Sequence, residues 1–205
     1  MSLFSPRIYL ASNSPRRREL LHQIQVNFEL LLFRGHPRED PDVMEDVLLG
    51  EEAAPYVQRI AYEKAMAGVK RIGIRKLFPL PVVAADTTIE LDGEIIGKPQ
   101  SAADAESILH KLSGRTHRVL TSVVVASDNR LEHALSVSEV RFRALESAEI
   151  RRYVASGEPM DKAGAYGVQG RAGMFIESIH GSYTGIMGLP LCETAMLLRH
   201  FGYPI

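Results

Sequence analysis

One stretch decides the fold class of this chain: Val82-Val83-Ala84-Ala85-Asp86-Thr87-Thr88-Ile89-Glu90-Leu91-Asp92-Gly93-Glu94-Ile95-Ile96. Its apolar and β-branched residues predict a strand over 82–91. The Asp92-Gly93 pair that follows is typical of the two-residue turn of an antiparallel hairpin. The turn also sets the register of the hairpin, which places Thr87 opposite Lys98. We therefore expect Lys98 to lie beside Asp86.

Strand and helix patterns alternate on both sides of this hairpin. We expect further strands at 7–11, 27–33, 119–126 and 134–142, helices near 15–24, 53–70, 102–112 and 146–155, and a last helix with Pro190 in its first turn. The alternation indicates an α/β fold, and the hairpin with the long neighbouring strands requires antiparallel pairs. The predicted fold is a mixed twisted sheet flanked by helices. Because no segment resembles a linker, we expect one domain over residues 1–205.

Composition excludes several classes of protein. The 205 residues carry a net charge of -1, so no global basic field would attract nucleic acid or an anionic membrane. The single cysteine, Cys192, excludes an internal disulfide framework and a CxxC metal or redox motif. No signal-peptide pattern opens the sequence, and no apolar run approaches the ~18 residues that span a bilayer. We expect a cytoplasmic protein.

The segment from Ser12 to Arg18, Ser-Asn-Ser-Pro-Arg-Arg-Arg, indicates an anion site. A serine N-cap followed by a proline predicts that a helix begins here. Arginines in a first turn oppose the positive end of the helix dipole unless an anion binds there. The candidate phosphate ligands are two serines and two arginines: Ser12, Ser14, Arg16 and Arg17. The alternative is a basic helix whose arginines extend into solvent or pair with acidic residues.

Lys64 is the second candidate. On the helix predicted over 53–70 it falls in the apolar stripe that Val57 and Ile60 share. A lysine is almost never buried without a partner, so an anion is expected at the end of its side chain. The alternative is a lysine at the edge of the stripe whose ammonium group reaches solvent.

Asp86 is the third candidate, because it ends the apolar run 82–85. Ligands gather beyond the carboxyl ends of strands in α/β sheets, where a carboxylate can bind a metal ion or act as a general base. The alternative is a structural salt bridge between Asp86 and Lys98.

The candidate cations and the carboxylate suit a polyphosphate better than a single phosphate. A nucleoside triphosphate carries roughly four negative charges and normally travels with Mg²⁺. The sequence holds no GxxxxGK[ST] P-loop, no HExxH and no GxSxG motif, and its seven histidines show no metal-ligand spacing.

An acidic stretch is interpreted as a solvated loop. Its carboxylates lie between residues 35 and 52: Glu39, Asp40, Asp42, Glu45, Asp46, Glu51 and Glu52.

Eight blocks carry a resemblance that covers nearly the whole chain. They are Leu10-Ala11-Ser12-Asn13-Ser14-Pro15-Arg16-Arg17, Glu63-Lys64-Ala65, Ala85-Asp86-Thr87, Gly97-Lys98-Pro99, residues 112–117, residues 161–170, residues 179–183 and Gly188-Leu189-Pro190. These blocks resemble the Maf family of nucleoside triphosphate pyrophosphatases. The resemblance implies a cleft between two lobes, and hydrolysis of a nucleoside triphosphate to monophosphate and pyrophosphate with a divalent metal, Mg²⁺ or Mn²⁺. It also implies a homodimer.

The resemblance further implies roles for individual residues. Asp86 matches the position assigned in the family as proton acceptor. Arg16, Thr87 and Gln169 match positions that set base preference, and this combination is similar to the branch acting on dTTP and UTP. A glutamine amide can match the imide edge of thymine and uracil by donating one hydrogen bond and accepting another. The acidic pair that helps to hold metal in the family has two candidates here, Glu39 and Asp40.

For the reaction itself, two roles of the aspartate stay open. Asp86 orients or deprotonates the attacking water, or it holds the Mg²⁺ that does so. Lys64 and Lys98, with the two arginines, would stabilise the charge that builds on the leaving pyrophosphate.

Three other functions compete with this interpretation. The first is a nucleotide-binding regulator of cell division, since the family is also discussed as inhibiting septum formation; it would act through a protein partner. The second is the activity on 7-methyl-GTP, whose branch has a different residue after the aspartate. The third is a nucleic-acid-binding module, which the net charge and the 7% aromatic content disfavour.

Overall fold

The structure is a computed structural model that describes residues 6–31, 43 and 45–205. Within these residues seven strands form one mixed sheet in the order β2-β1-β3-β5-β6-β7, and β4 also pairs with β3. The strands are β1 (Ile8–Leu10), β2 (Phe28–Leu30), β3 (Val82–Leu91), β4 (Glu94–Ile96), β5 (Thr116–Ser127), β6 (Arg130–Phe142) and β7 (Ile176–His180). The pairs β1–β2 and β1–β3 are parallel and the others are antiparallel. The predicted mixed sheet is confirmed.

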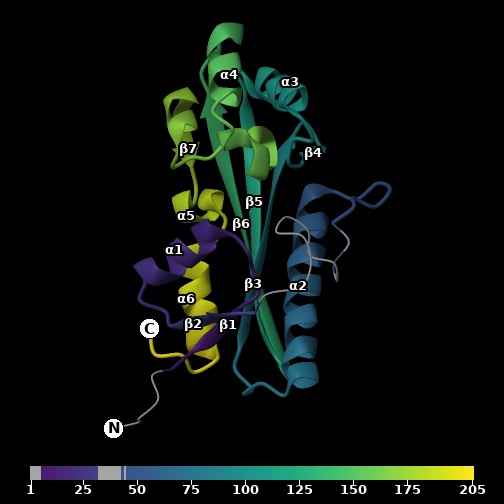
Figure 1. Cartoon of the computed structure of the whole chain (residues 1–205), viewed down its shortest axis with the longest axis vertical. Coiled ribbons are helices and arrows are strands. Elements are labelled where there is room, and N and C mark those ends of the chain that lie inside the picture. The colour runs from purple at the N-terminus through teal and green to yellow at the C-terminus, as the bar shows by residue number, and fades with distance from the viewer. Residues whose placement is uncertain (1–5, 32–42, 44) are drawn as a thin grey trace.

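The helices lie on both faces of the sheet (Figure 1). They are α1 (Pro15–Gln23), α2 (Ala53–Arg75), α3 (Ala102–Leu112), α4 (Ser147–Val154), α5 (Tyr183–Met187) and α6 (Leu191–His200). Three short 3₁₀ segments cover Glu158–Asp161, Ala163–Ala165 and Arg171–Phe175. No helix in the described part of the chain is both long and apolar enough to cross a membrane.

Alternation along β3 explains why helices cover both faces. Val83 and Ala85 pack with buried residues of α1 and α6, whereas Val82 and Ala84 pack with buried residues of α2. Successive side chains of a strand point to opposite faces, so a continuous apolar run belongs to a strand that is covered on both. A separate core at the other end of β3, around Ile89, packs against α3 and α4. Two lobes therefore share the long strands β3, β5 and β6 (Figure 1).

The hairpin register is confirmed only in part. Ile89 pairs with Ile96 and Leu91 with Glu94, but β4 ends at Ile96. Thr87 does not pair with Lys98; its ladder partner is Thr121 on β5. The chain turns away after Ile96, where the amide of Gly164 donates to the carbonyl of Gly97 at 2.9 Å.

One edge of β3 is consequently shared by two partners. β1 pairs with β3 at residues 82–83 and β4 pairs with it at residues 89–91, both on the edge opposite β5. Between these two pairings, residues 84–88 have no ladder partner on that edge within the described chain. Asp86 and Thr87 lie in this gap, which is where strands that diverge leave room for a ligand.

One buried histidine makes the stability of the fold depend on pH. His117 on β5 is 1% exposed, its Nε2 lies 2.8 Å from the hydroxyl of Tyr166, and its ring packs edge-on against Phe142. Burial lowers the pKa of His117 from its ordinary 6.5 to about 4. The unfolded chain therefore binds a proton that the folded chain does not, so stability is full above pH 6.5 and falls as the pH drops toward 4.

We expect the wild type to lose up to about 3 kcal/mol of unfolding free energy to this group over that pH range. The measurement is urea unfolding between pH 7.5 and 4.5 for the wild type and His117→Gln. The variant is less stable at neutral pH but has a flatter pH dependence. An identical slope in the two proteins would contradict the burial of a neutral histidine.

Candidate active site

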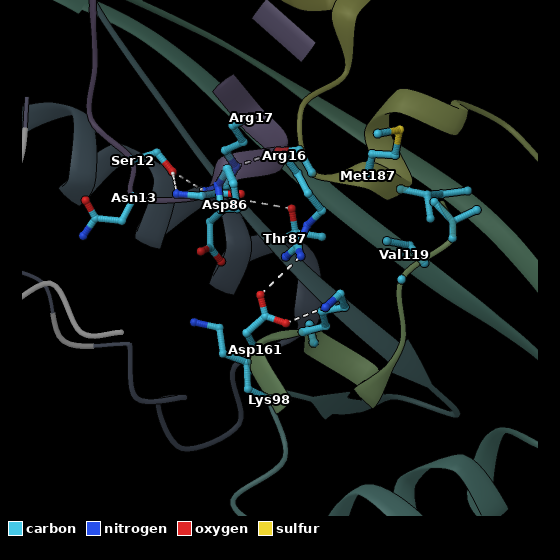
Figure 2. A pocket seen from close by; sticks show the side chains of 18 of the residues that line it. Ser12, Asn13, Arg16, Arg17, Asp86, Thr87, Lys98, Val119, Asp161 and Met187 are labelled. Carbon is cyan, nitrogen blue, oxygen red and sulfur yellow. Dashed lines mark hydrogen bonds and ion pairs between the residues drawn. The ribbon is translucent and has the colours of Figure 1, made fainter. Parts of the chain in front are cut away.

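A pocket opens at the gap beside β3, and all nine site residues that the sequence predicts within the described chain line it (Figure 2). They are Ser12, Ser14, Arg16, Arg17, Lys64, Asp86, Thr87, Lys98 and Gln169. The two metal candidates Glu39 and Asp40 lie outside the described residues. The pocket wall comes from the turn between β1 and α1, from α2 and β3, and from the loop around residues 160–169.

The start of α1 is open to an anion. Ser14 is the N-cap by backbone conformation, but its side chain makes no capping hydrogen bond and the first turn holds no acidic residue. The hydroxyl of Ser12 instead accepts a hydrogen bond from the amide of Ser14 at 3.2 Å. Helix amides without a side-chain cap favour a bound anion.

Arg17 ties three parts of the pocket together. Its Nε donates to the carbonyl of Gly188 at 2.8 Å, Nη1 to the hydroxyl of Ser12 at 3.2 Å, and Nη2 to the hydroxyl of Thr87 at 3.4 Å. Burial lowers the pKa of Arg17, an effect opposed by the charge of Asp86. Much of its donor capacity is used by the protein, so Arg17 fixes the wall of the pocket as well as its charge.

Arg16, in the first turn of α1, pairs with an aspartate of the loop around residues 160–169. Its Nη1 lies 3.4 Å from Oδ2 of Asp161, whose Oδ1 accepts from Nζ of Lys162 at 2.5 Å. Burial opposes ionisation of Asp161, but the hydrogen bond and charge of Lys162 hold its pKa below the ordinary value. Arg16 is therefore paired within the pocket and does not extend freely into solvent. Sequence reasoning missed Asp161, although it begins the block 161–170.

The buried centre of the pocket is a lysine between two carboxylates. Nζ of Lys64 lies 2.9 Å from Oδ1 of Asp86 and 2.5 Å from Oε1 of Glu45. Lys64 is 9% exposed and Asp86 is 8% exposed, so this ion pair is largely buried at the pocket wall. Burial alone would lower the pKa of Lys64, but the charges of Asp86 and Glu45 offset it and hold that pKa above its ordinary value. The expected anion is present, and it is a pair of carboxylates.

Glu45 is a site residue that the sequence interpretation assigned wrongly to a solvated loop. It lines the pocket, and the charge of Lys64 overcomes the effect of burial and holds the pKa of Glu45 low. Lys98 also faces it, with Nζ 3.9 Å from Oε2 of Glu45. The salt bridge between Lys98 and Asp86, which was the alternative interpretation of Asp86, is not among the ion pairs of the described residues. No local pattern separates Glu45 from the other acids of its stretch.

Asp86 and Glu45 fit a divalent metal that is shared with a phosphate ligand. Mg²⁺ is commonly held by one or two carboxylates plus substrate phosphates rather than by a full protein cage. The described residues contain no group of three or more His, Cys, Asp or Glu that could hold a metal ion. Lys64, which contacts both carboxylates, offsets part of their negative charge.

The opposite end of the pocket is less polar. The hydroxyl of Thr87 lies 2.9 Å from that of Thr121, which donates to the carbonyl of Gly185 at 2.8 Å. Met187 and Val119 line the pocket, and Figure 2 shows them on the side away from Lys98. The side chain of Gln169 is exposed and makes no hydrogen bond to another described residue, so its amide is available to a ligand.

Comparison with known proteins now identifies the family. The model of the family described as Maf-like protein matches residues 7–201. The chain belongs to the Maf family. A protein of Aromatoleum aromaticum named dTTP/UTP pyrophosphatase is 62% identical over 206 residues, covering 100% of both chains. One of Dechloromonas aromatica with the same name is 55% identical, covering 96% of this chain and 98% of its own.

Among solved structures, the Ham1 protein of Staphylococcus aureus superposes with a TM-score of 0.47 at 18% identity, covering 95% of this chain and 97% of its own.

The Maf blocks that the sequence singled out include the residues that meet in the pocket, namely Arg16 and Arg17, Lys64, Asp86 and Thr87, Lys98 and Gln169.

Proposed function

We propose that this protein hydrolyses nucleoside triphosphates, with dTTP and UTP preferred, to the monophosphate and pyrophosphate. The observation that carries the proposal is the buried Lys64 shared by Asp86 and Glu45 in a pocket bordered by Arg16, Arg17 and Lys98. Two carboxylates suit a metal and a water molecule, and the surrounding cations suit a polyphosphate. The Maf relatives named dTTP/UTP pyrophosphatase support the choice of reaction.

In this proposal Asp86 and Glu45 hold a divalent cation, Mg²⁺ or Mn²⁺. The cation would neutralise phosphate charge and make the bound phosphorus more electrophilic. This chain offers oxygen ligands for it, which is the ligand type that both ions prefer.

The chain's own side chains act on water and on the leaving group. Water attacks the α-phosphorus, the bond from that phosphorus to the α,β-bridging oxygen breaks, and Asp86 accepts the proton of the water. Lys64 binds Oδ1 of Asp86 at 2.9 Å, which orients the carboxylate for that role. Arg16 and Lys98 stabilise the charge that develops on pyrophosphate.

The other functions have less support. The curated Maf relatives carry the dTTP/UTP name, so an activity on 7-methyl-GTP is not favoured. A buried carboxylate beside a lysine and an anion site is machinery for turnover, which a nucleotide-binding regulator of cell division does not need. The homodimer and the cytoplasmic location stay predictions.

The test is to incubate the protein with Mg²⁺ and a panel of triphosphates while pyrophosphate and orthophosphate are measured separately. We expect pyrophosphate and monophosphate from dTTP and UTP, and loss of activity in excess chelator. Asp86→Asn purified in the same way controls for contaminating phosphatases. Orthophosphate as the first product would contradict the proposal, and full activity in chelator would remove the metal from it.

A further inference from the structure

The segment that carries Glu45 is held in place by side chains of α2. The hydroxyl of Tyr56 donates to the carbonyl of Glu45 at 3.0 Å. Nη2 of Arg59 donates to the carbonyl of the next residue, Asp46, at 2.9 Å. Two consecutive peptide groups are therefore fixed by the same helix that supplies Lys64.

Arg59 is itself locked by Glu51. Its Nε lies 2.7 Å from Oε1 of Glu51 and its Nη2 lies 2.8 Å from Oε2. The same Oε2 accepts a hydrogen bond from the amide of Leu48 at 3.0 Å. A bidentate arginine–carboxylate pair has a defined geometry that a lysine cannot reproduce. Arg59 thus joins both ends of the segment 46–51 to one point on α2.

Packing of apolar side chains does not hold this segment. Val47, Leu48 and Leu49 are 49%, 54% and 108% exposed. Burial holds the chain just before this segment, because Val43 is 7% exposed and packs in one cluster with residues of α2. Beyond it the exposed apolar side chains gain little from burial, so the hydrogen bonds from Tyr56 and Arg59 hold the backbone of residues 45–51. The position of the Glu45 carboxylate beside Lys64 depends on that backbone.

We propose that Arg59 is a positioning residue of the reaction, which holds the Glu45 carboxylate against Lys64 by clamping the segment 45–51 to α2. The inference rests on the proposed function, because it assigns Arg59 an effect on turnover. It predicts that Arg59 acts through Glu45 and not through the general stability of the protein.

The first test is kinetic and uses two substitutions singly and together. Arg59→Lys keeps the positive charge and removes the bidentate pair with Glu51. We expect kcat for UTP to fall about tenfold while KM stays within about twofold. In a Glu45→Gln protein the carboxylate that Arg59 positions is already absent. We therefore expect the double variant to have a kcat within about twofold of that of Glu45→Gln alone. Independent effects that multiply in the double variant would overturn the proposal.

A matched control exists in the other lobe. Arg143 also pairs with a glutamate through two nitrogens, at 2.7 and 3.2 Å to Glu149, and also donates to backbone carbonyls. Arg143→Lys therefore removes the same kind of interaction outside the pocket, and we expect kcat to stay within about twofold of the wild type. If kcat of Arg143→Lys also fell tenfold, the effect of Arg59→Lys would be explained by lost stability alone, and the proposal would be overturned.

The second test does not depend on activity. Amide hydrogen exchange of the peptide that covers residues 45–51 is expected to accelerate about tenfold in Arg59→Lys and to remain unchanged in Arg143→Lys. Unchanged exchange in Arg59→Lys would overturn the clamp. A wild-type protein that releases no pyrophosphate would refute the proposed function, while the exchange measurement would still decide whether Arg59 holds the segment.

Discussion

Asp86→Asn is expected to lower kcat for UTP hydrolysis by at least about 100-fold, the size of a typical general acid-base contribution. The substitution keeps the shape of the side chain, and the amide oxygen of asparagine can still accept from Nζ of Lys64, 2.9 Å from the present carboxylate oxygen. It removes the negative charge and the ability to accept a proton. Nucleotide binding is retained, because the arginines and Lys98 that surround the phosphates are untouched.

The control is the same change in the same hairpin but outside the pocket. Asp92→Asn leaves an Asn-Gly pair in a turn where residue 92 has a φ of 54°, a conformation that asparagine tolerates. We expect that variant to turn over at the wild-type rate. Circular dichroism and calorimetric titration with UTP in chelator establish folding and binding. A folded Asp86→Asn protein with wild-type turnover would refute the role of Asp86.

We expect kcat/KM for UTP to exceed that for CTP roughly 10- to 100-fold. The two substrates have the same size, but cytosine replaces one carbonyl and the ring N–H by an amino group and a bare nitrogen. A polar group that the bound base covers and leaves unpaired costs about 1–3 kcal/mol, which is about one to two decades in specificity. dTTP and UTP are expected ahead of ATP and GTP for the same reason.

Two variants of Gln169 show whether its amide carries this selectivity. Because the side chain makes no hydrogen bond to another described residue, a ligand can pair with it directly. Gln169→Ala removes the amide and should shrink the gap between UTP and CTP. Gln169→Glu leaves only acceptors, which suit the amino group of cytosine better than the carbonyl of uracil, so it should move the preference toward CTP.

Gln23 provides the control for these variants, since it is exposed at the end of α1 and does not line the pocket. Gln23→Ala and Gln23→Glu should leave the ratio unchanged. Equal rates on UTP and CTP, or an unchanged gap in Gln169→Ala, would show that another group reads the base while the pyrophosphatase activity stands.

Local signals in the sequence determined most of the sheet and most of the pocket. The apolar and β-branched residues of 82–91 and the Asp92-Gly93 turn predict β3 and its hairpin, because both signals come from residues adjacent in the chain. The helix predicted near 102–112 is confirmed as α3 (Ala102–Leu112), and Ser101 caps it by accepting from the amide of Asp104 at 3.1 Å. Site residues such as Lys64 and Asp86 were found because each breaks a local apolar pattern.

Contacts with neighbouring elements make β6 and α2 longer than the sequence pattern predicts. β6 begins at Arg130 and not at residue 134, since the ladder with β5 continues to Ser127 and takes polar residues into the strand. α2 continues to Arg75 and not to residue 70, because Ile72 adds one more buried turn to its apolar face. Both extensions depend on a partner that periodicity within the element does not reveal.

Only the tertiary structure decided what each charged residue faces. Lys64 meets Glu45 and Asp86, which lie 19 residues before it and 22 residues after it, and Arg16 meets Asp161 from the other lobe. A periodic pattern states which side of a helix or strand is buried, whereas the partner of a charge depends on how separate elements approach one another. The sequence by itself therefore determined that cations and a carboxylate belong to one site. The packing of α2 against β3, with the hydrogen bonds that hold the segment 45–51, decided that Glu45 completes it.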